Sequence, residues 1–232
     1  FIPLFWMASE DHDFQEISSL NIFNKNLSVV KEDEMGVGKL NPEIFTPILE
    51  SLKDLFKNDF RFKNLESIFS ASLNQQNWAN ATRYWISKVF VNENLIVIDA
   101  DDIKLKKLFL PIFKNELEKQ FIHNSVENTN NKLRSLGYEP KINPRVLNLF
   151  FLEDKKRYRI IFENNVFKIG DSNLKLEEIL SLLNSSPEKF SPNVLMRPIY
   201  QELLLPNLVY VGGPSELVYW SQLKKSFDQV DI

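Results

Sequence analysis

Phe1-Ile-Pro-Leu-Phe-Trp-Met7 opens the chain as an apolar run, which stops abruptly at Glu10-Asp11-His12-Asp13, before the amphipathic residues 14–17. A short aromatic and aliphatic run with polar residues at its border is typical of a buried strand in a parallel sheet. Ligands of such sheets bind beyond the carboxyl ends of the strands. The stretch therefore predicts three acids and a histidine at the functional edge of a parallel α/β sheet.

A second run repeats this pattern, because Leu95-Ile-Val-Ile98 is followed by Asp99-Ala-Asp-Asp102. A parallel sheet would place these acids beside the first cluster. Asp102 also has a structural interpretation, as the N-cap of a long helix over residues 103–136 that Pro111 interrupts.

Other patterns predict the remaining elements. In the first half we expect a strand at 27–30, a polar loop at 31–38 and helices at 42–56, 65–73 and 78–90. In the second half, β-type runs with short polar connections predict hairpins formed by strands at 146–152, 157–162 and 166–169. We then expect a helix at 174–183, a polar return to the core at 185–192, a further helix at 191–205 and a last strand at 208–211.

Composition limits the function classes. The chain has 232 residues, of which 44% are hydrophobic, so it can bury a core as one large domain or as a domain with an inserted subdomain. A net charge of −3 with interspersed signs argues against nonspecific nucleic-acid binding. The absence of cysteine excludes disulfides and fits a reducing cytosolic setting. No apolar run approaches the ~20 residues of a membrane span, and the start within a strand predicts a segment of a longer protein.

His12 is the strongest catalytic candidate, because a neighbouring carboxylate orients an imidazole and raises its proton affinity, as general acid–base catalysis needs. Glu10, Asp11 and Asp13 complete the catalytic candidates. Asp13 has an alternative, since with Glu16 it resembles a helix capping box. The adjacent His12-Asp13 pair also resembles a metal doublet, but His123 is the only other histidine, so we predict no metal site.

Gly212-Gly213-Pro214 follows an apolar run and predicts a strand-to-helix turn whose exposed amides hold a phosphate or carboxylate. Glu216 is a candidate binding residue in this turn. Its alternative role is that of a first-turn acid that favours the helix dipole.

Arg197 lies in an apolar, proline-rich neighbourhood after Ser191 and Asn193, where a guanidinium can clamp a carboxylate or phosphate. The alternative role of Arg197 is a buried ion pair with Glu202. Two further sets have structural interpretations: we expect Trp78, Tyr84 and Trp85 in the core, and a solvated face formed by Lys104, Lys106 and Lys107.

Six segments in order over essentially the whole chain resemble the bacillithiol biosynthesis cysteine-adding enzyme family. They are Phe5-Trp-Met-Ala-Ser-Glu-Asp-His-Asp-Phe14, Leu95-Ile-Val-Ile-Asp99, Gly137-Tyr138, Asn148-Leu-Phe150, Ser191-Pro-Asn-Val-Leu-Met-Arg-Pro198 and Tyr210-Val-Gly-Gly-Pro-Ser-Glu216. Lys141 departs from the pattern, because a glutamine is expected there.

The resemblance implies a Rossmann-like, mostly parallel core with helical and small antiparallel β insertions. It places the first part of the core at residues 1–139, the insertion at 140–186 and the return to the core at 187–232. It also implies an N-terminal glycine-glutamine turn and a C-terminal coiled coil for homodimerisation, both of which we expect outside this sequence.

The implied function is a cytoplasmic ligase that adds cysteine to glucosaminyl-malate, the last step of bacillithiol biosynthesis, with ATP as the expected means of activating the cysteine carboxylate. His12 would take the amine proton, oriented by Asp11 or Asp13, and Glu10 or a neighbour would hold the cysteine ammonium. Asn193 and Arg197 would hold malate carboxylates or a phosphate, and the amides of Gly212 and Gly213 an anion. A noncatalytic nucleotide- or amino-acid-binding module is the alternative, followed by a metal-dependent phosphohydrolase.

Overall fold

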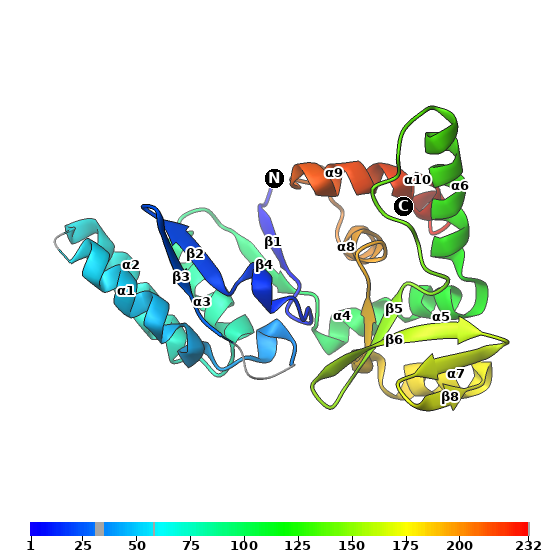
Figure 1. The fold of residues 1–232 in the computed structure, drawn as a ribbon, viewed down its shortest axis with the longest axis horizontal. Helices are drawn as coiled ribbons and strands as arrows, with labels where there is room; N and C mark the ends of the chain where they lie inside the picture. Colours follow the sequence, from blue (N-terminus) through cyan, green and yellow to red (C-terminus); the bar gives the residue numbers. More distant parts are fainter. Residues whose placement is uncertain (31–34, 58, 232) are drawn as a thin grey trace. The chain divides into compact units, whose positions relative to one another are not determined.

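The computed structural model describes residues 1–30, 35–57 and 59–231 (Figure 1). The chain forms two compact units, Phe1–Asp101 and Asp102–Ile232, and each is described by itself below. Every helix in the described ranges is too short or too polar to cross a lipid bilayer.

The first unit contains the predicted parallel strand pair. Strand β1, Leu4–Met7, pairs in parallel with β4, Ile96–Asp99, so that Met7 lies opposite Asp99 (Figure 1). The strand begins three residues later than the apolar run, after Pro3, which has no amide hydrogen to donate to a ladder. The carbonyl of Pro3 accepts a hydrogen bond from the Ile96 amide at 3.0 Å. The parallel direction of these segments is confirmed.

A hairpin follows β1 in the sequence. Strands β2, Ser19–Ile22, and β3, Lys25–Ser28, pair antiparallel, and Phe23 and Asn24 between them both have positive φ, as a tight hairpin turn requires. The sequence predicted a strand near β3 but not its partner. In the predicted polar loop, residues 31–34 lie outside the described residues, and Val37–Lys39 form a 3-10 turn, η2.

Three helices complete the first unit, and all three are confirmed. Pro42 opens a 3-10 turn, η3 (Pro42–Phe45), that leads into α1 (Thr46–Phe56), and α2 (Phe60–Leu73) and α3 (Trp78–Val89) follow. The Phe45 and Trp78 rings lie 4.0 Å apart, and those of Phe69 and Trp85 lie 5.8 Å apart. Both tryptophans make the ring contacts of packed residues, but the prediction that they and Tyr84 lie in the core is not met, because all three side chains are half-buried.

The second unit begins with α4 (Ile103–Leu108), α5 (Leu110–Lys119) and α6 (Phe121–Ser135). Asp102 accepts a hydrogen bond from the Lys104 amide at 2.8 Å, so it is the predicted N-cap. One break falls next to Pro111 as expected. Another, not predicted, falls at Gln120, whose φ is 49°.

The prediction of a solvated lysine face is wrong for Lys106. Its side chain is fully buried, and its ammonium donates to the Glu188 carbonyl at 2.9 Å. The long apolar stem allows a lysine to be buried when a carbonyl can accept from its charged end.

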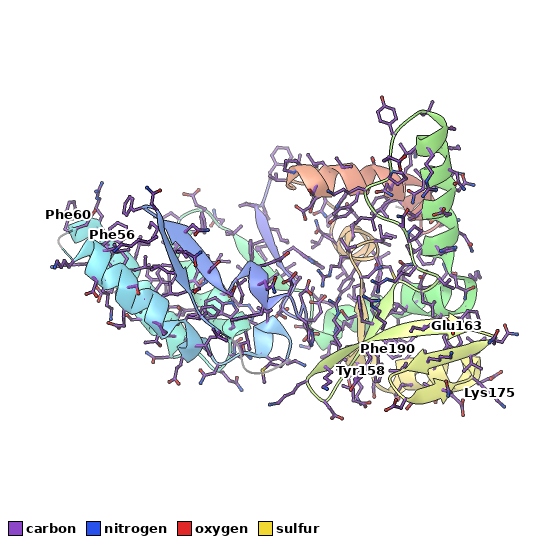
Figure 2. The ribbon with its side chains drawn as sticks, in the orientation of Figure 1. Phe56, Phe60, Tyr158, Glu163, Lys175 and Phe190 are labelled. Carbon is purple, nitrogen blue, oxygen red and sulfur yellow. The ribbon has the colours of Figure 1, made fainter. Side chains whose placement is uncertain are left out.

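An antiparallel sheet of order β8-β7-β6-β5-β9 forms the body of this unit. Its strands are β5 (Leu149–Glu153), β6 (Lys156–Glu163), β7 (Val166–Ile169), β8 (Ser172–Leu174) and β9 (Phe190–Pro192). Helix α7 (Leu176–Ser185) and the turn η4 (Pro187–Lys189) lead into β9. The Phe190 ring, labelled in Figure 2, meets the Phe151 ring edge-on at 5.4 Å.

The expected return to the core over residues 185–192 is wrong at β9, because this strand pairs with β5 in the antiparallel sheet. Phe190 is fully buried, as are its neighbours Ser191 and Pro192. Burial of this short segment against β5 outweighs the polar character of the residues before it.

The chain then forms α8 (Arg197–Leu204), α9 (Pro214–Trp220), a 3-10 turn η5 (Ser221–Leu223) and α10 (Lys224–Asp228). The strand predicted at 208–211 is wrong, since these residues join no sheet in the described chain. Leu208 is 77% exposed and Val211 is 90% exposed. A β-type run becomes a strand only where another edge pairs with it, and the Tyr210 ring instead stacks on Trp220 at 3.9 Å.

Candidate functional site

In the first unit, the candidate catalytic residues lie in the loop that leaves β1. Glu10 is buried, at 1% exposure, His12 and Asp11 are half-buried and Asp13 is exposed. The Nδ1 atom of His12 lies 3.0 Å from the Glu10 carbonyl oxygen. Because a carbonyl only accepts, Nδ1 carries the proton in this contact, and Nε2 holds the lone pair of the neutral ring.

That Asp11 or Asp13 orients the His12 ring stays a prediction. Asp11 Oδ1 accepts a hydrogen bond from the backbone amide of His12 at 2.8 Å, and the Glu10 carbonyl contacts the His12 ring. Asp13 precedes the 3-10 turn η1 (Phe14–Glu16), but its side chain makes no capping hydrogen bond. The capping alternative for Asp13 is therefore not formed.

The end of β4 meets this loop, as expected for parallel strands. Ser9 Oγ donates to Asp99 Oδ1 at 2.5 Å, and the Asp101 amide donates to the same oxygen at 3.1 Å. Asp99 Oδ2 lies 3.7 Å from Arg83 Nη2 on α3. Sequence reasoning missed Ser9 and Arg83, because neither stands in a distinctive pattern and only the fold brings them to Asp99.

A glycine segment holds the loop from its other side. The Gly38 amide donates to the Ser9 carbonyl at 2.8 Å, and the Val37 amide donates to the Asp11 carbonyl at 2.6 Å. A Cβ atom on Gly38 would lie 2.4 Å from the Ser9 Cβ, whereas one on Gly36 would lie 3.5 Å from His12 Cε1. Gly38 thus permits the close approach that shapes the site, a role that the predicted polar loop did not reveal.

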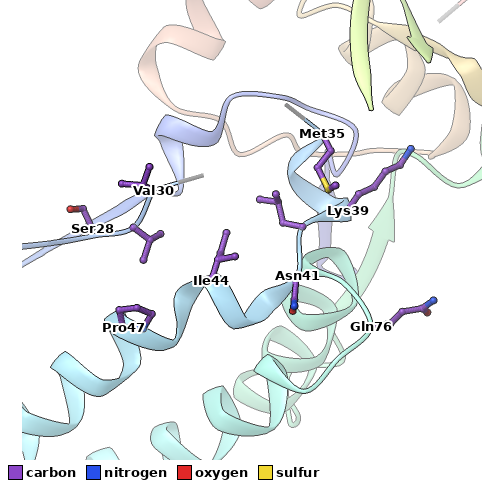
Figure 3. Close-up of a pocket in the computed structure, with 10 residues that line it drawn as sticks. Ser28, Val30, Met35, Lys39, Asn41, Ile44, Pro47 and Gln76 are labelled. Atoms are coloured by element: carbon purple, nitrogen blue, oxygen red, sulfur yellow. The ribbon is translucent and has the colours of Figure 1, made fainter. Parts of the chain in front are cut away.

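A cavity of about 820 Å³ lies in the first unit (Figure 3). Its described lining combines apolar side chains of Leu40, Ile44 and Pro47 with the polar groups of Asn41 and Gln76, and it includes no carboxylate or histidine. The described lining also includes Lys39, and the candidate residues Glu10, Asp11, His12 and Asp13 are not among the lining residues.

In the second unit, Asn193 belongs to a buried polar network. Its Nδ2 donates to Asn148 Oδ1 at 2.9 Å, and its own Oδ1 accepts from the Leu195 amide at 2.9 Å. Asn148 in turn donates from its backbone amide to Glu116 at 2.9 Å. Burial raises the pKa of the Glu116 carboxyl, while hydrogen bonds from Ile122 and Asn148 oppose that rise.

Arg197 and Glu216 approach the same side chain. Burial raises the pKa of the Tyr219 hydroxyl, the charge of Glu216 raises it further, and the charge of Arg197 lowers it. Glu202, the alternative partner of Arg197, accepts a hydrogen bond from Asn207 Nδ2 at 2.7 Å. The charges of two predicted binding residues, Arg197 and Glu216, thus both act on the Tyr219 hydroxyl.

The glycine turn before α9 is closed by its own acid. Glu216 Oε2 accepts from the Gly213 amide at 2.8 Å, and Oε1 accepts from the Tyr210 hydroxyl at 3.0 Å. A Cβ on Gly212 would lie 2.6 Å from the Tyr210 ring, so glycine lets the ring fold over the turn. With these hydrogen bonds formed, Glu216 acts as the first-turn acid of α9. An anion would have to displace the Glu216 carboxylate to reach the Gly213 amide.

Two groups therefore emerge, one in each unit. The first contains Glu10, Asp11 and His12 in the loop after β1, with Asp99 at the end of β4, and the second contains Arg197 and Glu216, whose charges both act on Tyr219. Across the described ranges, no set of three or more histidines, aspartates or glutamates is arranged to hold a metal ion.

The chain matches a family of known proteins over its whole length. The model described as "Bacillithiol biosynthesis BshC, N-terminal Rossmann-like domain" matches residues 1–232. A relative from Flavobacterium johnsoniae named "Putative cysteine ligase BshC" is 42% identical over 235 residues, which cover 100% of this chain and 44% of the relative. A protein of the same name from Flavobacterium psychrophilum is 40% identical, over 98% of this chain and 43% of the relative. One from Staphylococcus saprophyticus is 31% identical, over 100% of this chain and 46% of the relative.

The chain spans less than half the length of these relatives. The match confirms both the resemblance and the Rossmann-like α/β class predicted from the sequence.

Proposed function

Because the chain belongs to the bacillithiol biosynthesis BshC family, as its N-terminal Rossmann-like domain, we propose that the full-length protein is a cytoplasmic ligase that joins cysteine to glucosaminyl-malate. The observation that carries this proposal is the parallel pair β1–β4, which delivers His12 and Asp99 to one edge of the sheet. Dimerisation through a coiled coil beyond this domain belongs to the same proposal.

His12 is proposed to act as the general base. Amide formation joins the nitrogen of the sugar amine to the cysteine carboxyl carbon, and the activated oxygen leaves with its activating group. The amine proton must be removed as the bond forms. With Nδ1 donating to the Glu10 carbonyl, Nε2 is the nitrogen that accepts this proton.

The acids of the loop divide between support and substrate binding in this proposal. The Glu10 carboxylate is buried at 1% exposure, so a substrate ammonium reaches Asp11 or Asp13 more readily. Asp99 is held by Ser9 and lies near Arg83, which suits it to fixing the loop.

Arg197 is proposed to bind a malate carboxylate or a phosphate, because this half-buried residue begins α8 and its Nε and Nη2 atoms are buried. Asn193 is engaged with Asn148 and the α8 entry, so its contribution would be to position Arg197. ATP is the proposed source of activation. The glycine turn accommodates a phosphate only after Glu216 leaves the Gly213 amide.

The test uses the full-length protein with cysteine, glucosaminyl-malate and ATP, and product is followed by mass spectrometry. We expect His12→Gln to lower turnover by about 10²–10⁴-fold, the usual contribution of a general base. His123→Gln is the control, because it removes the other histidine, which lies on α6. Both variants should keep the circular dichroism spectrum of the parent protein.

Equal turnover of parent and His12→Gln proteins would remove His12 from the mechanism. Binding of substrates without turnover by the parent protein would favour the noncatalytic module instead. ATP consumption without coupling would favour a hydrolase.

A further inference from the structure

One face of the antiparallel sheet carries an arginine cluster that the proposed reaction does not use. Side chains alternate along a strand, so Arg157 and Arg159 of β6 lie on the same face. Arg159 pairs across the strands with Phe150, and Arg157 pairs with Leu152. The other face contains the buried Phe151 and Ile160. Figure 2 labels Tyr158 and Glu163, which lie on the same strand.

The guanidinium groups of Arg145 and Arg157 lie near the Phe150 ring. The Cζ of Arg157 lies 3.8 Å from the centroid of the Phe150 ring, and the Cζ of Arg145 lies 6.0 Å from it. Arg157 is held in place, because its Nη2 donates to the Pro192 carbonyl at 3.2 Å and lies 3.4 Å from Ser191 Oγ. One guanidinium is thus fixed on the ring, a second lies 6.0 Å from it, and Arg159 is the cross-strand partner of the same phenylalanine.

Two acids of this sheet pair with lysines. Glu163 pairs with Lys168 at 2.8 Å, and Glu153 pairs with Lys189 at 2.8 Å. Arg145 and Arg159 form no ion pair with any residue of the described ranges. Burial lowers the pKa of Arg145, and repulsion from Arg159 lowers it further, so the two guanidinium groups act on each other. Clustering like charges costs free energy unless an anion offsets it.

We propose that Arg145 and Arg159, on the sheet face where Arg157 is fixed over Phe150, form a binding site for a small oxyanion that carries two or more negative charges. The planar guanidinium presents paired donors that match the oxygens of a phosphate or carboxylate. Phosphate esters and dicarboxylates share this chemistry, and both would meet the two guanidinium groups of Arg145 and Arg159 on a preformed sheet face. The site goes beyond the proposed function, because its residues are distinct from His12, Arg197 and the glycine turn.

The experiment measures binding by isothermal titration calorimetry to the full-length protein at low ionic strength. Inorganic pyrophosphate and L-malate are the two probes, and they distinguish a phosphate from a dicarboxylate ligand. We expect Arg145→Gln and Arg159→Gln each to weaken binding of the preferred probe by about tenfold or more, since each removes a charged hydrogen bond.

Lys168→Gln is the matched control, because Lys168 is also a cation of this sheet but is already paired with Glu163. We expect it to change the affinity by less than about threefold, as remote surface charges are screened. Circular dichroism verifies the fold of each variant, and two separate arginine variants keep the test decisive if one does not fold.

Three results would overturn the proposal. They are no binding of either probe to the parent protein, unchanged binding in both arginine variants, and an equal loss in Lys168→Gln. Because the measurement needs no turnover, its outcome is independent of whether the protein ligates cysteine.

Discussion

Two apolar runs that precede polar clusters, residues 4–7 and residues 208–211, have different structures. The first pairs with β4 and carries a loop in which the side chains of Asp11 and His12 make hydrogen bonds with the backbone. The second joins no sheet in the described chain and leaves Leu208 and Val211 exposed. The comparison teaches that an apolar run specifies a strand only together with a second segment that pairs with it.

The largest expected effect tests this difference directly. Met7 in β1 is 7% exposed, whereas Leu208 is 77% exposed. We expect Met7→Ala to lower the free energy of unfolding by about 2–5 kcal/mol, because it removes buried apolar volume. Leu208→Ala should change it by less than about 0.5 kcal/mol. Urea denaturation of both variants measures the contrast, and similar losses would show that residues 208–211 are buried in solution.

A smaller effect concerns the glycine segment beside the β1 loop. Gly38→Ala places a Cβ 2.4 Å from that of Ser9, so we expect a loss of about 1–3 kcal/mol of unfolding free energy from overpacking. Gly36→Ala is the control, because its Cβ meets no atom closer than 3.4 Å and its φ of −54° suits alanine. Thermal unfolding compares the two, and equal midpoints would contradict the close packing of this loop.

The smallest effect probes the C-terminal turn through pH. Burial, followed by the Glu216 hydrogen bond, raises the pKa of the Tyr210 hydroxyl above its ordinary value of 10.0. The unfolded chain therefore loses this proton first. The stabilisation is complete below about pH 10 and is lost as the pH rises toward the folded-state pKa.

Tyr210→Phe should remove this pH dependence, so its stability should fall less steeply than that of the parent protein above pH 10. Urea denaturation at several alkaline pH values measures the slopes. Tyr219→Phe provides a comparison, since the pKa of Tyr219 is also raised. Identical slopes for the parent and Tyr210→Phe proteins would show that Tyr210 is not engaged with Glu216.

The sequence predicted the elements whose signals are local. Period and caps identified the helices α1 to α3 and the Asp102 N-cap, and alternation with short turns identified the hairpins. It did not predict β9, the break at Gln120 or the burial of Lys106, because each depends on a partner distant in the sequence or on tertiary packing. The same limit applies to the site, where the His12 cluster was visible but Ser9, Arg83 and Gly38 were not.

The pairing of β9 with β5 has a consequence for the order of folding. Strands β5 to β8 follow one another through short turns, so their contacts close small loops and should form early. Strand β9 follows α7 and η4 in the sequence, so its pairing with β5 closes a much longer loop of chain. We therefore expect β9 to pair with β5 late in folding. The hydrogen bond from the Lys106 ammonium to the Glu188 carbonyl, just before β9, should form at the same step.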